Sequence, residues 1–210
     1  MPHPSERGVL NSGRKEKLRL LTANANTWSS MQVLLEWLES KRQDDDASFQ
    51  VHGIAAQELR LREPEKVLAA QSWAWQRNFR LSLNRADRVG EAELAVSAGT
   101  GFLSRSDIAA APVELGTLAQ YASRVFASTI NIGLPFGLLV VSAYFKDGLG
   151  ASGFNLDLLE KVGEWLLAQR RPWLLMGDFN MSPSALASTG WLERVAGVVL
   201  APGGYNCFQG

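Results

Sequence analysis

The chain has 210 residues, of which 46% are hydrophobic, and its formal net charge at pH 7 is zero. This length supports one domain with a sizeable core, and the balanced charge gives no global sign of a polyanionic partner. The single cysteine, Cys207, excludes an intrachain disulfide and a cysteine metal cluster, which is compatible with a reducing compartment.

Residues 1–16 are rich in proline, serine, glycine and charge, so we predict a flexible leader followed by one domain over residues 17–210. The leader has no apolar stretch typical of a secretory signal, which favours an intracellular protein, nuclear or cytoplasmic. The longest uncharged stretch, residues 125–145, is interrupted by Asn131, Gly133 and Pro135. We therefore expect two strands joined by a turn there, and no contact with a membrane.

Strands and helices alternate in the first part of the domain. "KLRLLTANANTW" (17–28) predicts a buried strand that ends in polar residues, and "SSMQVLLEWLESKRQ" (29–43) predicts a helix with apolar residues at helical spacing. "SFQVHGIAAQEL" (48–59) predicts a second strand, and "EPEKVLAAQSWAW" (63–75) a helix that begins at a proline. We expect Trp73 and Trp75 to pack in the core, and short β-like segments between residues 78 and 130.

The second part begins with the most apolar strand of the chain, "FGLLVVSAYF" (136–145). The clearest helix, "FNLDLLEKVGEWLLAQR" (154–170), follows it, and "WLLMGDF" (173–179) predicts the next strand. Ser182 and Pro183 are suited to cap and begin a short helix. "AGVVLA" (196–201) predicts one more strand.

Four predicted strands end in polar residues, a favoured position for sites on α/β folds: Asn24 and Asn26, Gln57 and Glu58, Tyr144, and Asp178 and Asn180. Taken alone, Glu58 and Asp178 are either exposed loop acids or a Mg²⁺ site, because magnesium prefers hard oxygen ligands and commonly uses one or two carboxylates. A metal there would neutralise a phosphoryl group and help to generate a hydroxide nucleophile. The amides of Asn24 and Asn180 and the hydroxyl of Tyr144 would donate hydrogen bonds to phosphate oxygens.

Five segments carry a resemblance to a known family: "LRLLTANANTW", "IAAQEL", "GTGFLSRSD", "VVSAYF" and "WLLMGDFNMSP". Their order and approximate spacing are similar to those of the endonuclease/exonuclease/phosphatase superfamily, which includes abasic-site endonucleases, non-LTR retrotransposon endonucleases and phosphatases. The resemblance spans Leu18 to Phe208. It implies an α/β fold, a four-layer sandwich of two mixed sheets flanked by helices, with the last strands missing.

The resemblance also implies a role for each matching residue. Glu58 corresponds to the principal ligand of Mg²⁺ or Mn²⁺, and Asn24 to the asparagine near the metal and the scissile phosphate. Tyr144 matches the tyrosine that contacts phosphate. Asp178 is similar to the residue that activates the attacking water, and Asn180 to the stabiliser of the transition state.

Three further residues are candidates for substrate binding: Asn26, Trp28 and Arg60. Asn26 lies at the same strand end as Asn24. Trp28, just beyond it, is able to stack on a base. Arg60 is suited to contact a DNA backbone, but its position favours the alternative, a solvated charge at a helix start.

Two departures from the family pattern bear on activity. The family's Tyr-x-Pro-Asn is Tyr144-Phe145-Lys146-Asp147 here, so an acid replaces an amide. The Asp147 carboxylate would repel a phosphate unless a metal or Lys146 screens its charge. The alternative is a harmless difference in the loop. The family's terminal Asp-His motif is absent, and the only histidines are His3, in the leader, and His52, which we interpret as an ordinary sheet residue.

Loss of such a histidine costs roughly 10² to 10⁴ in rate. We therefore expect an incomplete domain with Mg²⁺-dependent phosphodiesterase activity, a DNA endonuclease of repair or retroelement type, impaired in this chain. One alternative is a phosphatase or lipid phosphodiesterase of the same superfamily. Another is a remnant that binds nucleic acid without catalysis.

Overall fold

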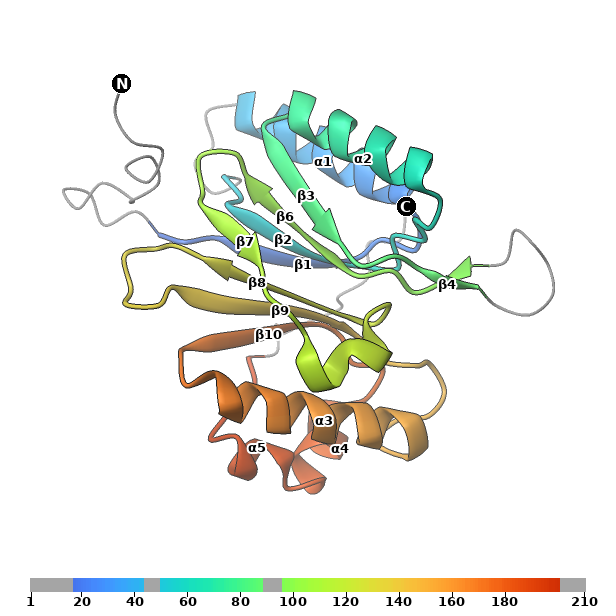
Figure 1. The fold of residues 1–210 in the computed structure, drawn as a ribbon, viewed down its shortest axis with the longest axis vertical. Coiled ribbons are helices and arrows are strands. Elements are labelled where there is room, and N and C mark those ends of the chain that lie inside the picture. The colour runs from blue at the N-terminus through green and yellow to red at the C-terminus, as the bar shows by residue number, and fades with distance from the viewer. Residues whose placement is uncertain (1–16, 44–49, 89–95, 201–210) are drawn as a thin grey trace.

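Two four-stranded mixed sheets form the centre of the molecule (Figure 1). The computed structural model describes residues 17–43, 50–88 and 96–200. Helices α1 and α2 lie over the outer face of one sheet, and α3, α4 and α5 over the outer face of the other. The predicted four-layer α/β sandwich is therefore confirmed. The predicted leader, residues 1–16, lies outside the described residues.

The first sheet has the strand order β1-β2-β6-β3. Strands β1 and β2 are parallel and stay in register from Leu20 opposite Gly53 to Asn24 opposite Gln57, so both end at the same edge. The other two pairings are antiparallel. The elements of this half are β1 (Leu20–Asn24), α1 (Trp28–Gln43), β2 (Gly53–Gln57), α2 (Pro64–Gln76), β3 (Phe79–Leu83) and β6 (Gly101–Arg105).

The second sheet has the order β10-β9-β8-β7, and its parallel pair is β9 and β10. A separate two-stranded ribbon joins β4 (Asp87–Arg88) to β5 (Val96–Ser97). The elements of the second half are β7 (Ala110–Pro112), the 3₁₀ helix η3 (Gly116–Tyr121), β8 (Val125–Ile130), β9 (Leu138–Tyr144), α3 (Gly153–Gln169), β10 (Trp173–Asp178), α4 (Pro183–Ser188) and α5 (Trp191–Arg194).

The two sheets pack through a buried apolar cluster that includes Ala55, Phe102 and Val140. A buried polar contact between Gln57 and Ser142 crosses the same interface. Gln57 is 1% exposed, and its Nε2 donates to Ser142 Oγ at 2.8 Å, while Ser142 Oγ donates to the Ala56 carbonyl at 2.9 Å. Buried polar groups are costly unless they are paired, so this contact fixes how the sheets are aligned.

Two local predictions were wrong. Residues 197–200 of the predicted strand 196–201 are irregular, and Val198 and Leu200 are 88% and 87% exposed. A strand needs a neighbouring strand to satisfy its backbone, and the described part of the chain offers none to this segment. Residue 201 lies outside the described residues. Trp75 is 56% exposed, because α2 buries Ala70 and Ala74 and turns Trp75 outward, whereas Trp73 packs inward as predicted.

Residues 125–145 form β8 and β9 joined by a turn, as expected. Within the described residues, no helix is long and apolar enough to cross a membrane.

Candidate active site

The carboxyl ends of β1, β2, β9 and β10 meet around one asparagine. Nδ2 of Asn24, at the end of β1, donates to Glu58 Oε1 at 3.0 Å and to Asp178 Oδ2 at 2.8 Å. A carboxamide nitrogen has two hydrogens, so both are used. One side chain therefore links two carboxylates that come from different sheets and lie far apart in the sequence.

Glu58 is the more enclosed of the two acids, with 9% of its surface exposed. Burial alone would raise its pKa, but hydrogen bonds from Arg60, Tyr144 and Asn24 outweigh that effect and the pKa is lowered. The Arg60 contact is an ion pair of 2.9 Å between Nη2 and Oε2. The site therefore favours an ionised, firmly oriented Glu58 carboxylate.

The backbone at Glu58 lies in the left-handed region, with φ of 53°. Such a conformation is costly for a residue other than glycine and persists only where its surroundings support it. Here the next two amides, of Leu59 and Arg60, donate to the carbonyls of Gly99 and Ala98 at 2.9 and 3.1 Å. This turn directs the Glu58 side chain toward Asn24.

Tyr144 ends β9, with its hydroxyl beside the Glu58 carboxylate. Burial, followed by hydrogen bonding to Glu58, raises the pKa of Tyr144 to about 12. The phenol therefore remains protonated at neutral pH and can act as a hydrogen-bond donor.

Asp178 and Asn180 are held by a tight turn at the end of β10. The Asn180 backbone nitrogen donates to Asp178 Oδ1 at 3.2 Å, and the Asn180 side-chain Nδ2 donates to the Phe145 carbonyl at 2.8 Å. Phe179, between them, stacks on Phe145 with ring centroids 5.1 Å apart. Alternation along the chain thus places Phe179 in the core and leaves the two polar residues at the site.

Gly177, which precedes Asp178, is required by close packing. A Cβ at this position would lie 1.9 Å from the Ala143 carbonyl oxygen of β9. No side chain fits there, because the obstacle is backbone of the neighbouring strand. The glycine therefore allows β10 to bring Asp178 up against the end of β9.

The three predicted substrate-binding residues have different surroundings. Asn26 is exposed, and its backbone nitrogen donates to Asn24 Oδ1 at 3.1 Å, which orients the bridging amide. Arg60 is exposed and pairs with Glu58, and it lies in the segment between β2 and α2 rather than at a helix start. Trp28 is partly buried, with its ring edge-on to Trp73 at 5.8 Å, so it packs between α1 and α2.

Two residues near the site were missed by the sequence interpretation. Arg124 lies opposite Tyr144, and the Tyr144 backbone nitrogen donates to the Arg124 carbonyl at 2.8 Å. The Arg124 guanidinium lies 4.9 Å from the centroid of the Tyr144 ring. Nothing in the sequence marks Arg124, because its position depends on strand register. Asn155, 0% exposed, is a polar residue within the apolar stripe of α3. A polar residue at a position where the spacing predicts burial indicates a structural or functional role, so the sequence contained a sign of it.

The two sequence departures also have structural outcomes. Asp147 is exposed, and its Oδ1 accepts a hydrogen bond from the Gly148 nitrogen at 2.8 Å, so the carboxylate caps its own turn. His52 is 4% exposed, directly precedes β2, and accepts from the Arg19 nitrogen through Nδ1 at 3.0 Å. It lies at the opposite end of β2 from Glu58, so it cannot supply the missing group. His3 lies outside the described residues.

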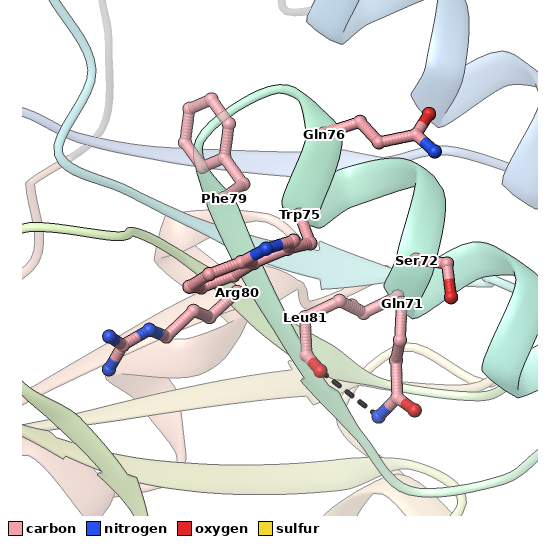
Figure 2. A pocket seen from close by; sticks show the side chains of 7 residues that line it. All are labelled: Gln71, Ser72, Trp75, Gln76, Phe79, Arg80 and Leu81. Atoms are coloured by element: carbon pink, nitrogen blue, oxygen red, sulfur yellow. Dashed lines mark hydrogen bonds between the residues drawn. The ribbon is translucent and has the colours of Figure 1, made fainter.

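A groove of about 500 Å³ lies away from this site, between α2 and the first part of β3 (Figure 2). Gln71 Nε2 donates to the Leu81 carbonyl across its floor at 3.2 Å. None of the carboxylates or amides described above lines it. The chemistry at the strand ends is therefore independent of this groove.

The residues present fit a hard divalent cation. Among the described residues no three acidic, histidine or cysteine side chains gather closely enough to hold a metal by themselves. Mg²⁺, however, usually takes one or two protein carboxylates and keeps several waters. Glu58 and Asp178, joined through one amide, supply that donor set.

Comparison with known proteins gives one matching family and several solved structures with a similar fold. The model of the "Endonuclease/Exonuclease/phosphatase family" matches residues 21–203. A search of curated proteins found no significant match.

Similar solved structures include the endonuclease domain of TRAS1, a telomere-specific non-LTR retrotransposon (12% identity, TM-score 0.52, covering 85% of this chain and 71% of that one). An AP endonuclease from Archaeoglobus fulgidus is 12% identical, with a TM-score of 0.54 and coverage of 86% and 70%. A family protein from Leptotrichia buccalis C-1013-b is 17% identical, with a TM-score of 0.55 and coverage of 85% and 73%. At these identities the likeness concerns the fold.

Proposed function

The chain belongs to the endonuclease/exonuclease/phosphatase family, and we propose on that basis that it hydrolyses phosphodiester bonds with the help of Mg²⁺ or Mn²⁺. The observation that carries the proposal is the Asn24 amide bonded to both Glu58 and Asp178. It brings two hard-oxygen donors and several hydrogen-bond donors to one place at the ends of four strands.

In this proposal Glu58 is the principal metal ligand and Asp178 completes the site. A bound divalent cation would neutralise charge on the phosphoryl group and lower the pKa of a bound water. The protein groups then have defined tasks. Asp178 accepts a hydrogen bond from the attacking water and orients it, and the water oxygen forms the new bond to phosphorus as the bond to the leaving oxygen breaks.

The hydrogen-bond donors act on the phosphate oxygens, where negative charge develops. Tyr144 is protonated and lies beside Glu58, and Asn24 and Asn180 have side-chain amides at the same strand ends. These three residues are proposed to bind the scissile phosphate. In the structure their hydrogens serve Glu58, Asp178 and the Phe145 carbonyl, so Asn24 and Tyr144 would turn theirs to the phosphate when the substrate binds.

We propose DNA as the substrate, cut by an endonuclease of repair or retroelement type. The family match and the similar folds of an AP endonuclease and a retrotransposon endonuclease support this choice. The cations Arg60 and Arg124 next to the site are suited to a polyanion. Activity measured on a panel of substrates, including phosphomonoesters and lipid phosphodiesters, distinguishes a DNA endonuclease from a phosphatase or lipid phosphodiesterase of the same family.

A second candidate is nucleic-acid binding without turnover, and the position of His52 favours it. His52 is buried at the far end of β2 and accepts a backbone hydrogen bond, so it is not available to a phosphate. The two candidates differ in rate, because the missing histidine would cost roughly 10² to 10⁴.

The test is nicking of supercoiled plasmid and of an oligonucleotide with an abasic site, in Mg²⁺, Mn²⁺ or EDTA. We expect metal-dependent cleavage that falls at least about 100-fold in Glu58→Gln and Asp178→Asn. Glu114→Gln, at an exposed acid away from the site, is the matched control and should keep wild-type activity. Cleavage that persists in both site variants would contradict the proposal. Salt-sensitive DNA binding with no measurable cleavage would favour the second candidate.

A further inference from the structure

Two cations share one aromatic ring beside the candidate active site. Lys146 Nζ lies 4.1 Å from the centroid of the Phe154 ring, and the guanidinium carbon of Arg124 lies 5.5 Å from it. The ring attracts each cation through its quadrupole, so it holds two like charges in the same part of the molecule.

Strand register explains why Arg124 faces the site. It lies opposite Tyr144 across the β8–β9 pairing, and side chains opposite one another emerge on the same face of a sheet. Tyr144 points toward Glu58, so Arg124 does as well. Its guanidinium is half-buried and also donates to the Tyr144 carbonyl at 3.4 Å.

Lys146 is placed by a buried asparagine. Asn155 accepts a hydrogen bond from the Lys146 nitrogen at 2.8 Å and donates Nδ2 to the carbonyls of Lys146 and Gly150 at 2.8 and 2.9 Å. The amide is therefore fully used in fixing the loop after β9. The Lys146 side chain is exposed but starts from a rigid backbone.

Three carboxylates near the two cations accept hydrogen bonds from other groups. Asp147 accepts from the Gly148 nitrogen, Asp87 from the Ser123 hydroxyl and Asp157 from the Tyr121 hydroxyl. Of the ion pairs within the described residues, none includes Arg124 or Lys146. Neither cation therefore forms an ion pair in this part of the chain, although Asp87 and Glu58 act on Arg124 electrostatically, and a bound anion would neutralise the positive charge that remains.

We propose that Arg124 and Lys146 form a second phosphate-binding site, which takes a backbone phosphate of a polynucleotide next to the scissile one. This inference rests on the proposed function for the identity of the substrate. Arginine offers a planar fork that matches two phosphate oxygens, and lysine adds a compact charge. The lysine at this position is one of the chain's own departures from the Tyr-x-Pro-Asn pattern.

The test measures DNA binding in EDTA by fluorescence anisotropy over a range of salt concentrations, so that no cleavage is needed. Lys146→Ala should weaken binding by about tenfold. The negative slope of log K against log salt should also become less steep by about 0.9, the value for one lost phosphate contact on duplex DNA. Lys146→Arg should restore both. Lys161→Ala, at another lysine, on α3 and ion-paired with Glu164, is the matched control. An affinity and slope in Lys146→Ala equal to those of the control would overturn the inference.

Arg124→Lys provides a second variant, because full truncation of a half-buried arginine can affect folding. It keeps the charge but loses the fork, so we expect a weaker affinity with an unchanged salt slope. Unchanged affinity in this variant would remove Arg124 from the site.

The outcomes separate this inference from the proposed function. Weaker DNA binding in Lys146→Ala without any nicking by the wild type supports the phosphate site and contradicts the nuclease. If Glu58→Gln abolishes nicking while Lys146→Ala leaves DNA binding unchanged, the result supports the nuclease and contradicts the second phosphate-binding site. Titration with inorganic phosphate distinguishes the ligand: phosphate that binds without displacing DNA would overturn the assignment to a polynucleotide.

Discussion

The two sheets approach the candidate site with the same geometry but hold their acids differently. Each presents the carboxyl ends of a parallel strand pair, β1 with β2 and β9 with β10. Glu58 of the first half is 9% exposed and accepts from Arg60, Tyr144 and Asn24. Asp178 of the second half is more exposed, and its two oxygens accept from Asn24 and from the Asn180 nitrogen. The enclosed acid is suited to hold a cation, and the more open one to meet water.

The largest effect is expected at the glycines that allow each half to pack. Gly177→Ala places a Cβ 1.9 Å from the Ala143 carbonyl oxygen, whereas Gly53→Ala in β2 places one 2.4 Å from the edge of the Phe102 ring. Backbone in a sheet cannot move aside, but a ring can adjust. We expect Gly177→Ala to lower the free energy of unfolding by about 3 kcal/mol or more, and Gly53→Ala by about 1–3 kcal/mol.

Urea unfolding followed by circular dichroism measures both values. Wild-type activity in Gly177→Ala would show that β10 tolerates the shift and that Asp178 need not lie so close to β9. A greater loss in Gly53→Ala than in Gly177→Ala would reverse the comparison between the halves.

The sequence predicted the elements better than the contacts between them. The helix at residues 154–170 was predicted correctly because its apolar residues recur at helical spacing, and the strand within residues 136–145 because it is a continuous apolar run that is buried almost throughout. The polar ends of four strands were recognised, and the structure brings Asn24, Glu58, Tyr144 and Asp178 together. Their chemical roles remain predictions.

The failures have a common cause, which is that they depend on tertiary neighbours. "AGVVLA" has the composition of a strand, but residues 197–200 have no partner strand in the described part of the chain. Trp75 is apolar, yet its position on α2 turns it outward. Arg124 was missed because only the pairing of β8 with β9 places it beside Tyr144.

An intermediate effect is expected where the two halves are joined. Gln57→Met removes the hydrogen bond to Ser142 while keeping a similar volume, and should cost about 1–3 kcal/mol in unfolding free energy because the buried partner loses its donor. Gln76→Met, at an exposed glutamine on α2, is the matched control and should change little.

A double-mutant cycle with Ser142→Ala makes this test specific. If the contact aligns the sheets, the two changes together should cost less than the sum of the single changes, by about 0.5–3 kcal/mol. Purely additive losses would mean that Gln57 and Ser142 act separately, and that apolar packing alone aligns the halves.

The smallest effect concerns acid stability, and it tests the contrast between the two acids directly. The folded pKa of Glu58 lies below its ordinary value of 4.5, because hydrogen bonds from Arg60, Tyr144 and Asn24 outweigh the opposing effect of burial. A depressed carboxyl pKa contributes stability that is fully present above the unfolded pKa and is lost as the pH falls through the folded one. In EDTA, the wild type should therefore lose stability on acidification below about pH 4.5 more steeply than Glu58→Gln, whose side chain does not titrate. Urea midpoints measured across this range, with Glu114→Gln as the control, check the expectation. Parallel curves for wild type and Glu58→Gln would mean that the three donors do not favour the ionised carboxylate, and Glu58 would then lose its advantage over Asp178 as the acid that holds the cation.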